Sequence, residues 1–231
     1  MTIIPVKIIK ICQETPTVKY LKLNLLEQDF NYKAGQWVDC YADIDGVRYI
    51  VGYSLASSPS KQGFIELAVK QSDNPVTKYI HSKAKAGDLL YVDGGQGEVF
   101  YETGMGSYVV LIAAGIGVAP LMGMMRYIVD VTDAMVTLFQ SSSTRDELIF
   151  YDELRNLSAN PRVTYYPFVT REASGDSVEA GRISGKVLKS HGVDMSSLFY
   201  LSGPGGMIPE LKEYLMGQGV DEARIKYELW W

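Results

Sequence analysis

An apolar segment that runs directly into glycines, Val109–Leu121, constrains this chain most. Residues 109–114 are all Val, Leu, Ile or Ala, which is typical of a strand buried on both faces of a parallel sheet. Gly115 and Gly117 lack a Cβ atom, so the backbone N–H groups of the following helix can approach a pyrophosphate. Pro120 stands where the common dinucleotide fingerprint has its third glycine, and the first helical turn tolerates proline. The segment predicts a strand, a phosphate-binding loop and a helix; a glycine turn without a ligand is the alternative.

The same region carries no charged side chain from Thr103 to Met125 and is long enough to resemble a membrane span. Its internal order argues against a single long helix. Residues 105–107, Met-Gly-Ser, are typical of a turn, and two glycines and a proline interrupt the middle. We therefore expect a strand, a loop and a helix here.

Composition excludes several classes of protein. The 231 residues are enough for two domains, and a hydrophobic content of 47% can fill their cores. The net charge of −5, with no basic stripe, disfavours nucleic acids and anionic membranes as partners. Cys12, Cys40, His81 and His191 match no metal or iron–sulfur spacing. Because the first residues alternate instead of forming a signal or transit sequence, we expect a cytoplasmic protein.

Residues 1–102 show short runs in which apolar and polar side chains alternate, such as 18–23 and 64–70. Turn-forming clusters separate these runs at 43–46, 57–63 and 86–88. This spacing is typical of a small antiparallel β-barrel. We expect residues 1–102 to form such a domain, with one helix inserted at about 76–83.

From Tyr108 onward the pattern changes to alternating strands and helices. We expect strands at 108–113, 134–139, 163–168 and 198–201, and helices at 119–129, 146–158, 183–190 and 205–217. Such alternation predicts right-handed crossovers and a mostly parallel sheet, whose ligands bind beyond the carboxyl ends of the strands. We therefore expect residues 103–231 to form an α/β nucleotide-binding domain.

Several motifs occur in the order found in one known family. They are Ala34-Gly35-Gln36, Tyr53-Ser54-Leu55-Ala56-Ser57, Ala86-Gly87-Asp88, Gly115 to Pro120, Asp146 to Leu154 and Ser202-Gly203-Pro204. In this order the chain resembles the ferredoxin–NADP reductase superfamily over nearly its whole length. Gln96-Gly97-Glu98 is similar to NAD(P)H:flavin reductases, and the C-terminal Glu-x-Trp-Trp resembles oxidoreductase NAD-binding-domain proteins.

The resemblance implies a flavin-binding barrel. The ring of Tyr53 would pack against the isoalloxazine, and the Ser54 hydroxyl would hydrogen-bond near flavin N5. Other implied flavin contacts are Leu55, Val69 and Thr77. Ordinary strand residues at 53 and 54, and a helix cap at Thr77, are the alternatives.

Two positions depart from the family's flavin pattern. The family usually has an arginine for the flavin phosphate where this chain has Val51, and a glycine where it has Asn74. Arg48 lies three residues before Val51, and this offset puts it on the opposite face of a strand. The resemblance implies FAD as the cofactor, and these two departures keep FMN and transient free flavin as alternatives.

The resemblance also implies nucleotide contacts. Gly115, Gly117 and Pro120 would lie at the pyrophosphate, and Ser202, Gly203 and Pro204 beside the nicotinamide. Thr170 and Arg171 follow an expected strand where NADP-specific relatives often bind the 2′-phosphate, and an arginine fork suits a phosphate. Residues 141–145 and Arg182 offer further hydroxyls and cations, so NADP is favoured and NAD stays open.

The chain ends in Glu228, Leu229, Trp230 and Trp231. In relatives a terminal aromatic residue covers the flavin and a nearby glutamate precedes it, so the resemblance implies Trp230 or Trp231 and Glu228 as site residues. A terminal strand anchored by tryptophan in the core is the alternative.

Together these features predict a flavin-dependent NAD(P)H oxidoreductase in which nicotinamide stacks on flavin in a dry cleft between the domains. Ser54, Ser202 and Glu228 are the predicted catalytic residues. No iron–sulfur motif is present, so we expect a separate acceptor: a ferredoxin- or flavodoxin-like protein, another redox protein, or free flavin. A non-catalytic nucleotide-sensing or interaction module that has lost flavin is the alternative.

Overall fold

The computed structural model describes residues 2–229, with the side chain of Leu229 left out. The chain divides into two compact units. The first comprises Met1–Glu102 together with Met122–Tyr127, and the second comprises Thr103–Leu121 together with Ile128–Trp231. Trp230 and Trp231, both predicted site residues, lie outside the described residues.

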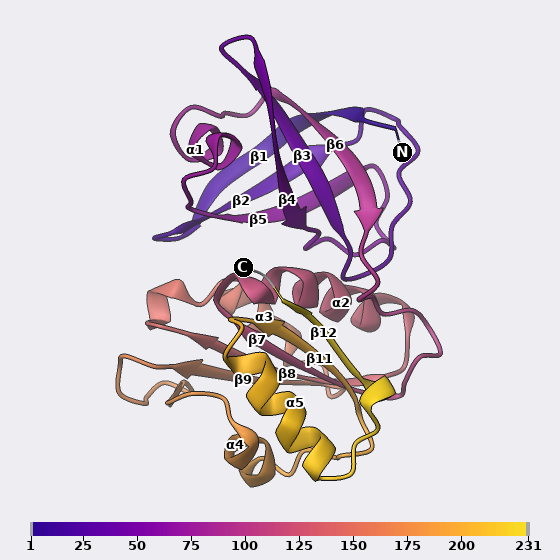
Figure 1. Ribbon diagram of the computed structural model, residues 1–231, viewed down its shortest axis with the longest axis vertical. Coiled ribbons are helices and arrows are strands. Elements are labelled where there is room, and N and C mark those ends of the chain that lie inside the picture. Colours follow the sequence, from indigo (N-terminus) through magenta and orange to yellow (C-terminus); the bar gives the residue numbers. More distant parts are fainter. Residues whose placement is uncertain (1, 230–231) are drawn as a thin grey trace. The chain divides into compact units, whose positions relative to one another are not determined.

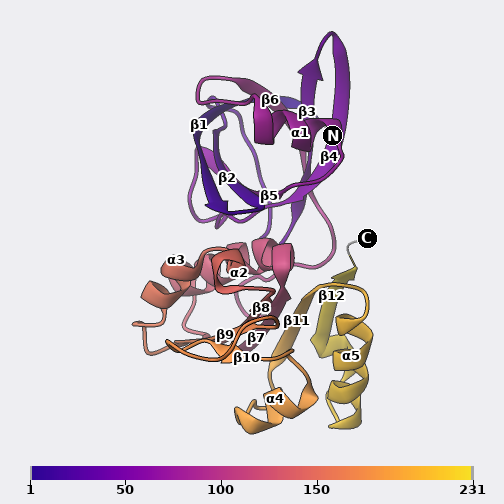
Figure 2. The same ribbon diagram turned by 90° about the vertical axis from the view of Figure 1, so that its left-hand side faces the viewer.

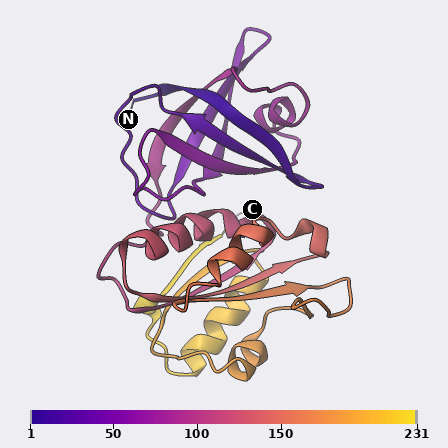
Figure 3. The same ribbon diagram turned by 180° about the vertical axis from the view of Figure 1, so that it is seen from behind.

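The first unit is an antiparallel sheet that curls into a barrel, with one helix, α1 (Pro75–Ser82), beside it (Figure 1). Its strands pair in the order β4-β3-β6-β1-β2-β5. The bridge between Leu55 and Leu67 brings the end of β4 to β5, and Figure 3 shows β1, β2 and β5 side by side. The strands are β1 (Ile4–Thr15), β2 (Val18–Asn24), β3 (Trp37–Ile44), β4 (Val47–Ser54), β5 (Phe64–Lys70) and β6 (Leu89–Gln96).

Side chains along each strand alternate between buried and accessible positions, and the buried ones form the barrel core. In β3, Val38, Cys40 and Ala42 are buried, while the residues between them stay partly accessible. This is the period of two that a pleated strand imposes. Full burial of a side chain such as Leu67, which is 0% exposed, contributes about 1.5–3 kcal/mol. The predicted antiparallel barrel is confirmed.

The second unit contains a parallel sheet in the order β10-β9-β8-β7-β11-β12. Helices α2 and α3 lie over one face and α4 and α5 over the other (Figure 2). The order reverses between β7 and β11, which are neighbours in space, so the chain has a topological switch point there. The strands are β7 (Tyr108–Ala114), β8 (Met135–Ser142), β9 (Val163–Val169), β10 (Glu179–Ala180), β11 (Leu198–Gly203) and β12 (Ile225–Leu229).

The helical elements of this unit follow the predicted alternation. They are the 3-10 turns Gly115–Gly117, Arg145–Glu147 and Glu222–Arg224 and the helices α2 (Val118–Val131), α3 (Tyr151–Leu157), α4 (Gly185–Ser190) and α5 (Met207–Gly217). The predicted strand, loop and helix over residues 109–121 are confirmed, with Pro120 in the first turn of α2. Among the described residues, no helix is long and apolar enough to cross a membrane.

The helix predicted over residues 146–158 is wrong in its first half. Leu148, Ile149 and Phe150 are all buried, and successive residues of a helix cannot all point to one side. The backbone therefore leaves helical geometry, and Phe150 adopts a left-handed conformation with φ of 60°. The buried Gln140 side chain donates to the Ile149 carbonyl at 2.9 Å, which satisfies a group that a helix would have bonded.

Candidate functional site

The glycine loop after β7 is the first part of the candidate nucleotide site. Gly115 has φ of 55°, and a Cβ atom there would meet nothing within 4 Å. The backbone is therefore both unusual and open at this residue, as close approach of a phosphate requires. These features fit the predicted pyrophosphate loop.

Gly117 has a different reason to be glycine. A Cβ atom there would lie 2.3 Å from the Ser202 carbonyl oxygen and 2.9 Å from the Gly203 nitrogen. The end of β11 therefore passes directly against the loop, and any side chain at Gly117 would push the two apart. The loop and the residues predicted beside the nicotinamide are thus brought together.

Ser202 and Glu228 meet at the same edge of the sheet. They are register partners on β11 and β12, and Ser202 also pairs with Ala113 on β7. Ser202 is 3% exposed, and its Oγ has no hydrogen-bond partner among the described residues. A buried hydroxyl without a partner is costly and invites a ligand group.

Glu228 is partly buried, and this burial raises the pKa of its carboxyl to about 7. Removal from water disfavours the ionised form, which explains the direction of the change. A carboxyl that titrates near neutrality can hold or release a proton at physiological pH. The predicted site residues Ser202 and Glu228 thus bring together a hydroxyl without a partner among residues 2–229 and a titratable acid.

The loop after β11 holds the other predicted nicotinamide residues. A Cβ atom on Gly203 would lie 2.7 Å from Met207 Cε and 3.1 Å from Ala114 Cβ, so packing requires glycine there. Pro204 is exposed, and its carbonyl accepts a hydrogen bond from the Met207 backbone at 3.0 Å. This bond fixes the turn that leads into α5.

The loops after β8 and β9 lie side by side. The Thr170 and Arg171 backbone N–H groups donate to the carbonyls of Ser142 and Ser143 at 3.1 and 3.0 Å. The loop with Thr170 and Arg171 and the loop with residues 141–145 are therefore parts of one surface. Arg171 is exposed.

Arg145, by contrast, contacts acidic residues of the loop after β9. Its backbone N–H donates to Glu172 at 2.9 Å, and its guanidinium lies 3.3 Å from an Asp176 oxygen. Arg182 follows β10, where the Gly181 N–H donates to the Val169 carbonyl at 2.8 Å. The exposed Arg182 thus stands at the same strand edge as Arg171.

In the first unit, Tyr53 and Thr77 form one buried pair. The Tyr53 hydroxyl and Thr77 Oγ1 are 2.7 Å apart, and burial raises the pKa of Tyr53. The alternative role of Thr77 as a helix cap is wrong, since Asn74 is the N-cap of α1 and its side chain accepts from the Val76 N–H at 2.8 Å. The pairing locks the Tyr53 ring against helix α1.

The other predicted flavin residues differ in accessibility. Ser54 is partly exposed and pairs in register with Trp37, while Leu55 and Val69 are 0% exposed and belong to the barrel core. The Leu55 N–H donates to the Gln36 carbonyl at 2.9 Å. Leu55 and Val69 are therefore buried throughout and present no surface for a ligand to contact.

Arg48 does not replace the arginine that the family has at Val51. Arg48 makes a two-pronged contact with Asp43, both N–O distances being 2.8 Å, and its guanidinium lies over the Tyr91 ring. The Asn74 amide also donates to the Ile50 carbonyl at 3.2 Å. Neither Val51 nor Arg48 therefore supplies the arginine contact to the flavin phosphate that the family pattern implies.

Sequence reasoning missed Trp37. Its ring packs against Gly52, where a Cβ atom would lie 3.4 Å from Trp37 Cε3, and it pairs in register with Ser54. Its position directly after the Gly35-Gln36 turn was the available signal. Within residues 2–229, no group of three or more His, Cys, Asp or Glu side chains is arranged to hold a metal ion.

Comparison with known proteins places the chain in a family. Residues 5–101 match the model of the oxidoreductase FAD-binding domain, and residues 111–213 match that of the oxidoreductase NAD-binding domain. The Homo sapiens protein "Oxidoreductase NAD-binding domain-containing protein 1" is 30% identical over 96% of this chain and 79% of its own length.

Solved structures agree with the sequence matches. The flavohem-like FAD/NAD binding domain of nitric oxide dioxygenase from Vibrio cholerae is 26% identical, with a TM-score of 0.88 over 98% of both chains. A ferredoxin NADP+ reductase from Neisseria gonorrhoeae, with bound FAD and NADP, shares the fold at 22% identity, with a TM-score of 0.82 over 99% of both chains. The chain therefore belongs to the ferredoxin–NADP reductase superfamily.

Proposed function

We propose that this chain is a flavin-dependent NAD(P)H oxidoreductase that transfers hydride from NAD(P)H to flavin and passes the electrons to a separate acceptor. In this proposal residues 1–102 bind FAD, or in its place FMN or transient free flavin, and residues 103–231 bind the nucleotide. Bound flavin supplies the redox chemistry, accepting a hydride and giving up electrons. The chain's own residues bind, orient and manage protons.

The edge formed by Gly115, Ser202 and Glu228 carries the proposal. Its loop is open to a phosphate, its buried hydroxyl has no partner among residues 2–229, and its carboxyl has a pKa raised to about 7. Ser202 would donate to or accept from the nicotinamide carboxamide, and Glu228 would hold a proton near it. A ligand group would satisfy the buried Ser202 hydroxyl, and a carboxyl that titrates near neutrality suits the handling of a proton.

On the flavin side, Tyr53 and Ser54 are the proposed ring contacts, with Ser54 at N5. The Tyr53–Thr77 hydrogen bond fixes the ring of Tyr53, so little side-chain freedom would be lost on binding. Trp230 and Trp231 are further proposed residues for covering the flavin.

The choice of nucleotide depends on the strand edge at Thr170, Arg171 and Arg182. Arg145 is engaged by Glu172 and Asp176, while Arg171 and Arg182 are exposed. NADP(H) is therefore the proposed nucleotide, and NAD(H) is the alternative.

The acceptor is proposed as a ferredoxin- or flavodoxin-like protein or free flavin. A cytoplasmic location belongs to the same proposal and is supported by Cys12 and Cys40, both free thiols, which suit a reducing compartment.

The direct test is the visible spectrum of the full-length protein with added FAD or FMN, followed anaerobically after NADPH or NADH. Binding of flavin, followed by bleaching of its absorption band, supports an oxidoreductase. If the protein binds nucleotide but neither binds nor bleaches flavin, the result supports the second candidate function, that of a nucleotide-sensing module. Val51 and Asn74, which replace the expected phosphate contacts, favour that candidate.

A further inference from the structure

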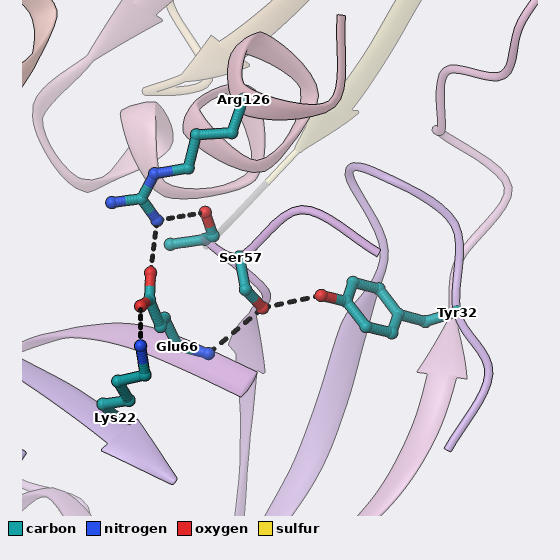
Figure 4. Close-up of polar contacts among 6 residues, drawn as sticks. Lys22, Tyr32, Ser57, Glu66 and Arg126 are labelled. Carbon is teal, nitrogen blue, oxygen red and sulfur yellow. Dashed lines mark hydrogen bonds and ion pairs between the residues drawn. The ribbon is translucent and has the colours of Figure 1, made fainter. Parts of the chain in front are cut away.

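A buried ion pair ties helix α2 to strand β5 within the first unit. Arg126 Nη1 lies 2.5 Å from Glu66 Oε2, and the two side chains are 16% and 10% exposed (Figure 4). Lys22 of β2 contacts the other Glu66 oxygen at 3.4 Å. An ion pair this buried is weak evidence for a role in stability, because desolvation offsets much of the attraction.

Arg126 also contacts the segment that follows Tyr53 and Ser54. Its guanidinium donates to the Ala56 carbonyl at 2.7 Å. A single planar group thus holds a main-chain oxygen of this segment and a carboxylate of β5 at once. Both contacts come from one nitrogen, Nη1, whose two N–H groups point in fixed directions within the guanidinium plane.

Glu66 and Tyr32 hold the rest of this segment through hydrogen bonds. The Ala56 N–H donates to the Glu66 carbonyl at 2.8 Å, and Ser57 Oγ accepts from the Glu66 N–H at 3.1 Å. The Tyr32 hydroxyl lies 2.7 Å from Ser57 Oγ, as Figure 4 shows. Every residue from Leu55 to Ser57 therefore has a fixed backbone or hydroxyl contact.

Gly123, one helical turn before Arg126, packs against the same backbone. A Cβ atom on Gly123 would lie 2.6 Å from the Leu55 carbonyl oxygen and 3.0 Å from that of Ser57. The helix can approach the segment this closely only because residue 123 has no side chain. Two independent features of α2 thus converge on residues 55–57.

We propose that Arg126 is a positioning residue for the flavin-binding segment, acting through the Ala56 carbonyl and the Glu66 carboxylate. This inference rests on the proposed function, because the segment's role in flavin binding is part of that proposal. Arg126 sets the path of the backbone directly after Tyr53 and Ser54, and hence the placement of both side chains. Small displacements of positioning groups have large effects on reaction rate.

The test compares the full-length protein with Arg126→Met and Arg126→Lys. We expect Arg126→Met to weaken flavin binding and lower kcat by about tenfold to a hundredfold, with KM for the nicotinamide nucleotide little changed. The visible circular dichroism of bound flavin should change as well. Arg126→Lys should recover part of the affinity, because a lysine keeps the charge but presents rotatable donors on a flexible side chain instead of N–H groups in fixed directions.

Arg162→Met is the matched control. Arg162 is another partly buried arginine whose guanidinium donates to main-chain carbonyls, those of Val129 at 3.2 Å and of Thr132. Its loss should lower the free energy of unfolding without changing flavin affinity or the flavin spectrum. If Arg126→Met and Arg162→Met behave alike, the positioning role is overturned.

Gly123→Ala gives a second variant that keeps the ion pair. We expect it to weaken flavin binding as Arg126→Met does, while Gly217→Ala, at a helical glycine with open space around it, should leave binding unchanged. If Arg126→Met fails to fold, Gly123→Ala and Arg126→Lys decide the matter. Unchanged flavin affinity in both would overturn the inference alone, whereas a wild-type protein that neither binds nor reduces flavin would overturn the proposed function as well.

Discussion

Ser202 on β11 and Glu228 on β12 are direct register partners in the parallel sheet. One offers a buried hydroxyl without a partner among the described residues, and the other a carboxyl whose pKa is about 7. Both features are unfavourable for a protein without ligands. Their pairing at the strand edge next to the glycine loop is what distinguishes this position from the rest of the sheet.

Removing the Ser202 hydroxyl should lower the activity without lowering the stability. We expect Ser202→Ala to leave the free energy of unfolding unchanged or raise it by about 1 kcal/mol, because a buried unpaired group disappears. The same variant should lower kcat with NADPH by about tenfold or more. Urea unfolding and anaerobic flavin reduction measure the two quantities. Tyr214→Phe removes the other buried unpaired hydroxyl of the described chain and should affect stability alone.

Glu228 makes stability depend on pH. Because its pKa is raised in the folded state, the folded protein binds the proton more tightly than the unfolded chain. This contribution is complete at pH values below the ordinary carboxyl pKa and is lost as the pH rises toward about 7. After discounting for partial exposure, we expect a loss of about 1 kcal/mol over this interval.

Urea unfolding of the wild type and of Glu228→Gln at several pH values measures this dependence. The variant should show a flatter profile, and Glu213→Gln, at an exposed helical glutamate, should keep the wild-type slope. Equal slopes in wild type and Glu228→Gln would contradict the assignment.

Arg171 should set the preference for NADPH. If its guanidinium contacts the 2′-phosphate, Arg171→Ala should raise KM for NADPH by about tenfold and leave KM for NADH unchanged, as loss of one charge-assisted hydrogen bond implies. Steady-state kinetics with both nucleotides give the ratio. Arg145→Ala is the control, since Arg145 is engaged by Glu172 and Asp176. An unchanged NADPH/NADH ratio in Arg171→Ala would refute the phosphate contact.

Restoring the family's cation should strengthen flavin binding. Val51 is partly buried beside the core of the barrel, whereas the adjacent Ile50 is 49% exposed. We expect Val51→Arg to tighten FAD binding by about tenfold through a charge-assisted phosphate contact. Ile50→Arg adds the same charge on the other face and should have little effect. Fluorescence titration with FAD and with riboflavin, which has no phosphate, would show whether the gain depends on phosphate.

The sequence predicted those features that depend on local pattern. The order of strands and helices, the barrel followed by the parallel sheet, and the turn at Gly115–Pro120 all follow from periodicity, glycine and proline. Family resemblance suggested Ser202 and Glu228 as separate site residues, and the structure shows that they pair on β11 and β12.

Features that depend on contacts distant in sequence could not be predicted in this way. Gly117 is glycine because the Ser202 backbone passes against it, and Arg126 pairs with Glu66 across the fold of the first unit. The start of α3 shifted because three consecutive apolar residues, 148–150, all needed burial. Tertiary packing overrides local helical preference in such a segment.

The participation of Met122–Tyr127 in the first unit means that this unit is not one uninterrupted stretch of chain. A fragment ending at Glu102 would lack the guanidinium that neutralises the buried Glu66 carboxylate. During synthesis on the ribosome, the barrel can therefore reach its final packing only after β7 and much of α2 have emerged. The order in which the chain appears thus delays completion of the N-terminal half, although domains commonly mature from the N-terminus onward.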